Sequence, residues 1–213
     1  DLYILLTKNG VDVEINYPSI YHHLDSFGAN FKLRGAKGQH WTNLRACAFF
    51  EDFKEDKIVW IELTDEGRFS YCKDEIYLLN SAYFLLPPKR FKTGYLLSIL
   101  NSKIIKFYLS NIANTSGVGT LRWINAYVKD FPIVNTDNNT QEILSKLADE
   151  ITILKLSLNQ AKITFTDYLS SKYSLDRVSK KLQSWYDLEF NEFLKELKIV
   201  KLSLSEEAEW MQY

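Results

Sequence analysis

The sequence predicts an α+β fold: a small antiparallel β-sheet domain with packed helices, followed by a long C-terminal helical hairpin or arm. Two contrasting parts of the chain carry this prediction. The first part contains short runs rich in Ile, Val, Phe, Tyr and Trp, and turn-forming residues separate them. Residues 136–213 contain no glycine and are dense in Leu, Lys, Glu and Ser, as long helices are. We therefore expect an α+β domain at residues 1–135 and a helical, coiled-coil-like region at residues 136–213.

Three strands are expected at residues 57–63, 68–71 and 76–86, where β-branched and aromatic side chains are concentrated. Turn-prone acidic and glycine-containing segments lie between them. This spacing predicts an antiparallel meander. Pro87 and Pro88 should end the last strand, because proline has no N–H to donate to a sheet.

Apolar residues recur at the 3.6-residue period of an α-helix in three later stretches. The first, residues 96–112, predicts one amphipathic helix of about five turns. A loop and a shorter helical turn at residues 125–130 should follow. The second predicts a long helix at residues 140–173, with Asn138 or Asn139 as its N-cap. The third predicts a helical region at residues 175–200, and Ser205 should cap a last helix.

The composition limits the class of protein. The chain has 213 residues, 46% of them hydrophobic, and 26 basic against 27 acidic residues leave a net charge of -1. Cys47 and Cys72 are too few for a disulfide framework. No apolar run reaches the roughly 20 residues of a membrane span, and no signal peptide is visible, so we expect a cytoplasmic protein. The sole methionine is Met211, which predicts that the chain is part of a longer polypeptide.

Sequence motifs of catalytic sites are missing from the chain. There is no phosphate-binding glycine loop, no dinucleotide fingerprint, no nucleophile elbow, no paired-histidine zinc motif and no CxxC. The adjacent His22 and His23 lack the spacing that chelates one metal, and the acidic clusters are typical of surface loops. We therefore expect no catalytic residue, no metal and no cofactor in this chain.

The charge is distributed unevenly along the chain. Residues 76–129 contain seven basic residues and no acidic residue, and residues 26–50 contain four basic residues and no acidic residue. Because local positive fields attract phosphates, these two windows are candidates for binding nucleic acid.

Two polar loops lie within these windows. Residues 35–45 combine glycines and cations with amide and imidazole groups that can read base edges, and residues 115–123 offer backbone N–H groups and hydroxyls to a phosphate. The alternative interpretation of the first loop is a surface loop without a function, and that of the second is an ordinary loop after a helix. Trp41 and Trp123 could stack on bases, but most tryptophans are core residues. The candidate DNA-binding residues are Lys37, Gln39, His40, Trp41, Asn43, Arg45, Lys89, Arg90, Lys92, Lys103, Lys106, Ser116, Gly117, Arg122 and Trp123.

A series of short sequence motifs, in this order along the chain, resembles a known family. They include NGVD at 9–12, YPSIYHHL at 17–24, WTNLR at 41–45, KIVWIEL at 57–63, FSY at 69–71, YLLN at 77–80, YLLSILNSK at 95–103, GTLRW at 119–123 and FPI at 131–133. The series is similar to the TaqI-like C-terminal specificity domain, the target-recognition domain of type IIG restriction-modification enzymes. The words WYDLEFNEFLKEL at 185–197 and EEAEW at 206–210 resemble the helical tail of those enzymes.

The resemblance implies a non-catalytic, DNA-reading fragment of a larger polypeptide. That parent would be a type IIG restriction endonuclease and adenine-specific DNA methyltransferase that uses S-adenosylmethionine and Mg²⁺. The partners implied are double-stranded DNA and the upstream methyltransferase and nuclease domains, and the catalytic NPPY motif of the methyltransferase is absent from this chain.

We expect sequence-specific DNA target recognition. In this hypothesis Lys89, Arg90, Lys92, Lys103, Lys106 and Arg122 contact phosphates, and the loop at residues 35–45 reads bases. The alternative is a helical protein-interaction or dimerisation module with a basic docking face, which the alternating Lys and Glu of the C-terminal helices permit.

Overall fold

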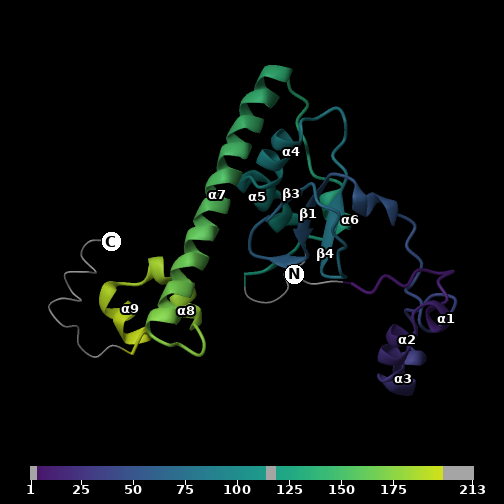
Figure 1. Cartoon of the computed structure of the whole chain (residues 1–213). Coiled ribbons are helices and arrows are strands. Elements are labelled where there is room, and N and C mark those ends of the chain that lie inside the picture. Colours follow the sequence, from purple (N-terminus) through teal and green to yellow (C-terminus); the bar gives the residue numbers. More distant parts are fainter. Residues whose placement is uncertain (1–3, 114–118, 199–213) are drawn as a thin grey trace. The chain divides into compact units, whose positions relative to one another are not determined.

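The computed structural model of the chain describes residues 4–113 and 119–198 (Figure 1). The chain divides into two compact units, Asp1–Ser145 and Lys146–Tyr213. The first unit contains a small antiparallel sheet with packed helices, and a long helix leads into the second. The predicted α+β class is therefore confirmed.

The main sheet has three antiparallel strands in the order β3-β1-β4. They are β1 (Lys57–Ile61), β3 (Ser70–Cys72) and β4 (Ala82–Leu85). Ile58 lies opposite Tyr71 on one side and Leu85 on the other. The predicted meander is wrong in its order, because β1 is the central strand. Its Ile58 and Trp60 are buried, and pairing on both edges satisfies the backbone of this most apolar strand.

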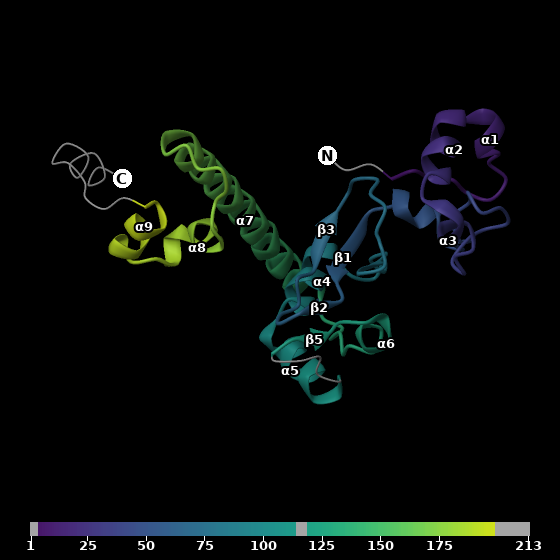
Figure 2. The same ribbon diagram turned by 90° about the horizontal axis from the view of Figure 1, so that it is seen from below.

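A second, two-stranded pairing joins β2 (Leu63–Thr64) to β5 (Leu121–Arg122), which lie side by side in Figure 2. The sequence pattern predicts a loop at residues 114–120 but no strand after it. Tryptophans fasten this pair to the main sheet. The indole N–H of Trp60 donates to the carbonyl oxygen of Trp123 at 2.7 Å, and that of Trp123 donates to Thr64 O at 3.1 Å.

The predicted five-turn helix is two helices, α4 (Thr93–Leu100) and α5 (Lys103–Ile112). Ser102 separates them because its backbone is extended and its hydroxyl accepts the N–H of Ile105 at 3.3 Å, as an N-cap does. Asn101 ends α4 and binds both backbone groups of Phe69, next to the main sheet. The predicted short helix is confirmed as α6 (Asn125–Val128).

Short helices form the N-terminal part of the first unit. They are α1 (Val13–Asn16), α2 (Pro18–Asp25), α3 (Gly28–Lys32) and the 3-10 helix η1 (Glu51–Lys54). Asp12 caps α1 by accepting the N–H of Ile15 at 3.0 Å, and Pro18 occupies the first turn of α2, where its missing N–H has no cost.

The long helix α7 (Asn138–Lys172) is confirmed, but its cap is Asp137 and not Asn138 or Asn139. The Asp137 carboxylate accepts the backbone N–H of Thr140 at 2.9 Å and the hydroxyl of the same residue at 2.7 Å. These bonds lower the pKa of Asp137 to about 2. The first turns of α7 belong to the first unit, where Gln141 accepts the N–H of Lys92 at 2.9 Å.

The second unit packs short helices against the end of α7. They are α8 (Lys180–Gln183), the 3-10 helix η2 (Trp185–Asp187) and α9 (Phe190–Glu196). Leu169 of α7 forms a buried cluster with Leu182, Phe193 and Leu197. The helical region predicted at residues 175–200 is therefore divided into three pieces. Ser205, the predicted cap of a last helix, lies outside the described residues.

Among the helices of the described part, none is long and apolar enough to cross a membrane.

Candidate nucleic-acid interface

The loop at residues 35–45 has a defined backbone path. Gly38 N–H donates to Asn43 O at 2.9 Å, and Asn43 N–H donates to His40 O at 2.9 Å, which closes a tight turn. Lys37 and Leu44 form a bridge across its base, and Leu44 N–H donates to Thr7 O at 2.7 Å. The loop is thus hydrogen-bonded both internally and to the N-terminal segment.

Asn43 holds this loop from inside. Its side chain is 3% exposed, and its amide nitrogen donates to the carbonyl oxygens of Lys8 at 3.1 Å and Val11 at 3.0 Å. Its oxygen accepts the N–H of His40 at 3.2 Å. Because both amide hydrogens are bound within the protein, the geometry gives Asn43 a positioning role and not the base contact that the sequence suggested.

A second asparagine, Asn9 of the NGVD motif at residues 9–12, also holds this loop. Its side-chain oxygen accepts the N–H of Gln39 at 2.8 Å. A Cβ on Gly38 would lie 2.1 Å from that oxygen and 2.5 Å from Leu44 O, so only glycine fits there. The sequence carries no signal of this brace, because Asn9 lies 30 residues before Gln39 and the two meet only through tertiary structure.

Four of the predicted loop residues are exposed: Lys37, Gln39, His40 and Arg45. The ring nitrogen Nδ1 of His40 lies 2.8 Å from the hydroxyl oxygen of Thr42, which orients the imidazole and leaves Nε2 for an external partner. Amide, imidazole and guanidinium groups are the side chains that hydrogen-bond base edges in the major groove. The structure therefore brings these four candidates to the surface of one ordered loop.

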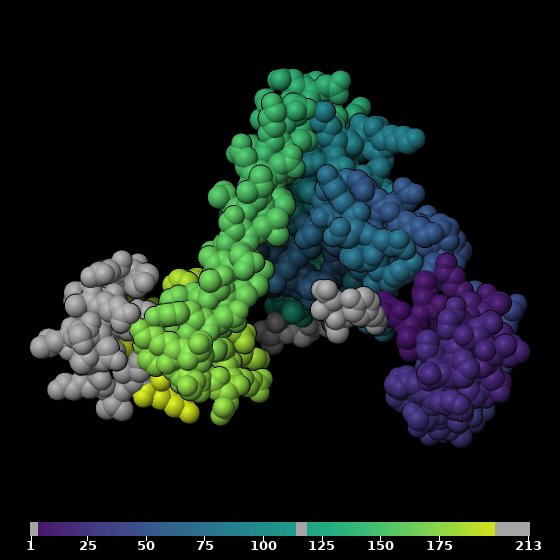
Figure 3. All heavy atoms as spheres, in the orientation of Figure 1, coloured from purple at the N-terminus to yellow at the C-terminus, as the bar shows by residue number. Residues whose placement is uncertain are grey.

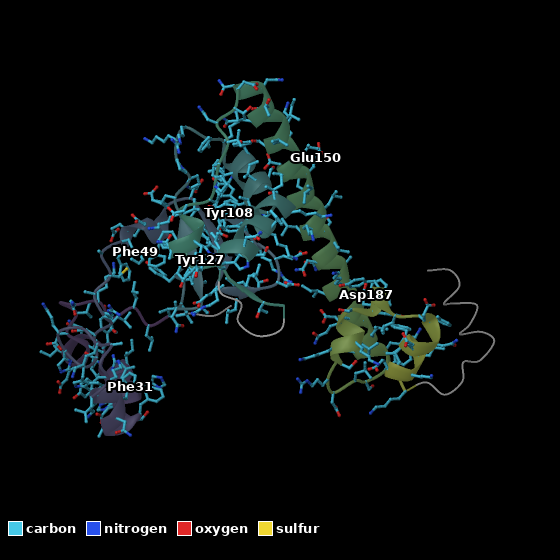
Figure 4. The ribbon with its side chains drawn as sticks, turned by 180° about the vertical axis from the view of Figure 1, so that it is seen from behind. Phe31, Phe49, Tyr108, Tyr127, Glu150 and Asp187 are labelled. Carbon is cyan, nitrogen blue, oxygen red and sulfur yellow. The ribbon has the colours of Figure 1, made fainter. Side chains whose placement is uncertain are left out.

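Trp41 belongs to an aromatic cluster of the N-terminal helices. Its ring centroid lies 5.3 Å from that of Tyr21 and 6.4 Å from that of Phe31, and the Lys32 ammonium lies 4.8 Å from its centre. Figure 4 labels Phe31 in this helical part. The half-buried indole is engaged in packing, which supports the core interpretation over stacking on a base.

Residues 76–129, which contain no acidic residue, are partly neutralised in the folded structure. Three of its cations pair with carboxylates from elsewhere in the chain: Arg122 with Glu62, Lys106 with Glu66 at 3.7 Å, and Lys92 with Glu142 at 2.7 Å. The exposed cations for which the described residues provide no carboxylate partner are Lys89, Arg90, Lys103 and Lys129. Arg90 lies over the ring of Phe91 at 4.8 Å.

Arg122 is the most strongly neutralised of these cations. Both its Nε, at 3.1 Å, and its terminal nitrogen bond the same oxygen of Glu62, which raises the pKa of the guanidinium further. The side chain of Glu62 is 18% exposed and also accepts the hydroxyl of Tyr83 at 3.4 Å. Glu62 therefore competes with a phosphate for Arg122.

The other candidates of the second loop differ in position. Trp123 is 1% exposed and joins the two sheets through its hydrogen bonds, so its ring is a core element. Ser116 and Gly117 lie outside the described residues.

Possible metal ligands do not cluster in the described ranges, 4–113 and 119–198, where no group of three or more His, Cys, Asp or Glu side chains could hold an ion. His22 and His23 are exposed on α2.

Comparisons with known proteins match two parts of the sequence to two family models. Residues 8–133 match the family model described as "TaqI-like C-terminal specificity domain". Residues 136–213 match a model described as "Domain of unknown function (DUF8810)". A search of curated proteins found no match to the chain.

Proposed function

Because the chain belongs to the family of TaqI-like C-terminal specificity domains, which recognise DNA targets in restriction-modification enzymes, we propose that its loop at residues 35–45 reads the target sequence. The observation that carries this proposal is the fastening of that loop by Asn43 and Asn9 while Gln39 and His40 remain exposed. Base readout needs polar groups held in register, and an ordered loop supplies them without a large entropic cost on binding.

Phosphate contacts would come from the exposed cations that the described carboxylates leave unpaired. Lys89, Arg90 and Lys103 fit this role, because a lysine or arginine without an ion-pair partner gains most from a phosphate. Lys92, Lys106 and Arg122 contribute less in this proposal, since each already pairs with a carboxylate that offsets its charge. Phosphate contacts set the register of the protein on the duplex, and the loop then sets the sequence.

In this proposal the catalytic reactions of the parent polypeptide take place in other domains. The chain itself is non-catalytic, and upstream methyltransferase and nuclease domains of the same polypeptide supply the adenine methylation and the cleavage. S-Adenosylmethionine and Mg²⁺ would bind those domains and not this chain.

The test compares target selection by the proposed restriction-modification polypeptide, wild type and with Gln39→Ala/His40→Ala, from a randomised duplex pool at fixed salt. We expect the double variant to lose discrimination at one or two base pairs, by roughly 1 to 3 kcal/mol each. The control Gln160→Ala, on the exposed middle of α7, should select the wild-type sequence. An unchanged selected sequence with Gln39→Ala/His40→Ala would place base readout outside this loop.

A second experiment isolates the phosphate-binding cations. Lys89→Ala/Arg90→Ala should weaken binding to all duplexes alike and reduce the salt slope by about 0.9 for each phosphate that the variant no longer neutralises. Lys195→Ala, on α9, is the matched control. Weaker binding to one sequence alone would contradict the phosphate role.

The alternative, a helical interaction or dimerisation module with a basic docking face, is favoured by one observation: the middle of α7 is exposed on every side.

A further inference from the structure

The exposed middle of α7 is unusually apolar. Every residue from 149 to 161 is exposed, and half of residues 151–160 are Ile or Leu. In Figure 3 the atoms of α7 are the green spheres. Most of the stability of helices in proteins comes from the packing of an apolar face, and contiguous exposed apolar surface of this kind marks an interaction site.

The apolar residues on one side of this stretch follow a heptad repeat. Leu147, Ile151, Leu154 and Leu158 are spaced by four, three and four residues, and their exposed fractions are 47%, 57%, 68% and 51%. In heptad notation they occupy the d, a, d and a positions, and Ala161 continues the series. Ile151 at a is flanked by Leu147 and Leu154 at d, and Ile at a with Leu at d favours two strands in a parallel coiled coil.

The flanking charges favour a second copy of this chain as the partner. Glu150 occupies a g position and Lys155 the following e position, and both are exposed. In a parallel, in-register pair of helices, g of one helix faces e of the next heptad in the other, five residues further along. Glu150 of each copy would therefore meet Lys155 of the other, twice by symmetry. Figure 4 shows Glu150 projecting from the helix.

An antiparallel pair would lack these contacts. It would face e positions with e positions, where Lys155 and Lys162 lie. We therefore propose that residues 147–161 of α7 form a parallel two-stranded coiled coil with the same residues of a second copy of this chain. The proposal is independent of DNA recognition, since its tests contain no DNA.

The same stretch supplies its own control. Ile153 and Leu156 are exposed at 63% and 65% but lie about 200° around the helix from Ile151 and Leu154. Substitutions at either pair change the same types of residue in the same helix, and only one pair lies in the proposed seam.

The first test is sedimentation velocity of the full chain over a concentration series. Wild type should sediment as a dimer, and Ile151→Glu/Leu154→Glu should raise the dimer dissociation constant by about 30-fold or more. Ile153→Glu/Leu156→Glu should leave it within about twofold, and circular dichroism should give equal helix content for both variants. A wild-type monomer at all concentrations, or equal weakening by both variants, would overturn the proposal.

The second test addresses the orientation. Glu150→Lys and Lys155→Glu should each weaken the homodimer about two- to fivefold, because each places like charges opposite one another on both sides of the pair. Mixing the two variants should restore wild-type affinity, since both g–e contacts of a parallel heterodimer then pair a lysine of one variant with a glutamate of the other. Absence of recovery on mixing would exclude the parallel register.

Discussion

The backbone N–H of Gln39 donates to the side-chain oxygen of Asn9 over 2.8 Å, which fastens an exposed loop to a segment 30 residues earlier in the chain. The same oxygen lies 2.1 Å from the position that a Cβ on Gly38 would occupy. The hydrogen bond therefore exists only because residue 38 has no side chain.

Gly38→Ala should disturb this loop. The added methyl group would also lie 2.5 Å from Leu44 O, so the backbone must shift, and we expect a decrease of about 1 to 3 kcal/mol in the free energy of unfolding. Urea unfolding measures this decrease. Selection from a randomised duplex pool should show weaker discrimination.

Gly35→Ala is the matched control for that experiment, because nothing lies within 4 Å of a Cβ there and its φ is not positive. We expect a change within about 0.5 kcal/mol. Equal destabilisation by the two alanines would mean that the contact with Asn9 does not constrain the loop.

Lys57 should be essential to the stability of the first unit. Its side chain is fully buried at the start of β1, and its ammonium donates to Glu55 O at 2.8 Å and Asp74 O at 2.9 Å. Lys57→Met keeps the apolar stem but leaves both carbonyls without this donor, so we expect a decrease of about 1.5 to 3 kcal/mol in the free energy of urea unfolding. Lys73→Met, at an exposed position, should change stability little.

The cap of α7 should titrate at low pH. The pKa of Asp137 is about 2, because the hydroxyl and the backbone N–H of Thr140 both donate to its carboxylate. A carboxylate with a lowered pKa in the folded state contributes stability above its unfolded pKa of about 3.9. That contribution disappears as the pH falls from about 4 through about 2.

Carbon NMR of the Asp137 carboxyl group as a function of pH would measure this pKa. In Thr140→Val the hydroxyl is gone and the backbone N–H remains, so the midpoint should rise only part of the way to its usual value. A midpoint near about 4 in the wild type would contradict the capping role.

Glu62→Gln should release Arg122 for phosphate binding. Glutamine keeps the size of Glu62 but cannot neutralise the guanidinium that the carboxylate now pairs. We expect the salt slope of DNA binding to become steeper by about 0.9. Arg122→Gln in the wild-type background should leave the slope unchanged.

Glu192→Gln, an exposed change of the same kind in α9, controls for net charge. A flatter salt slope with Arg122→Gln alone would show that Arg122 leaves Glu62 to bind phosphate in the wild-type protein.

Local signals in the sequence correctly located many elements. The apolar period located α7, and the breaker Pro132 lies four residues beyond the end of α6. Local signals did not locate helix ends correctly where several neighbouring side chains could act as the cap. Asn138 and Asn139 looked like caps, but Asp137 accepts the two bonds of Thr140. Similarly, apolar spacing ran through Asn101 and Ser102, where side-chain bonds to Phe69 and Ile105 divide the helix.

The α+β class, the long C-terminal helix and the family follow from the sequence, because apolar periodicity and the order of short motifs depend only on residues along the chain. Which of the predicted residues face outward depends instead on the three-dimensional structure. Asn43 and Gln39 are equally polar, yet one is buried as a brace and the other is exposed. In the folded structure Glu62 and Glu142, which lie outside residues 76–129 in the sequence, pair with cations of that window. Electrostatic fields and hydrogen bonds act through space, so partners that lie far apart in sequence fix the charge and the reach of each side chain.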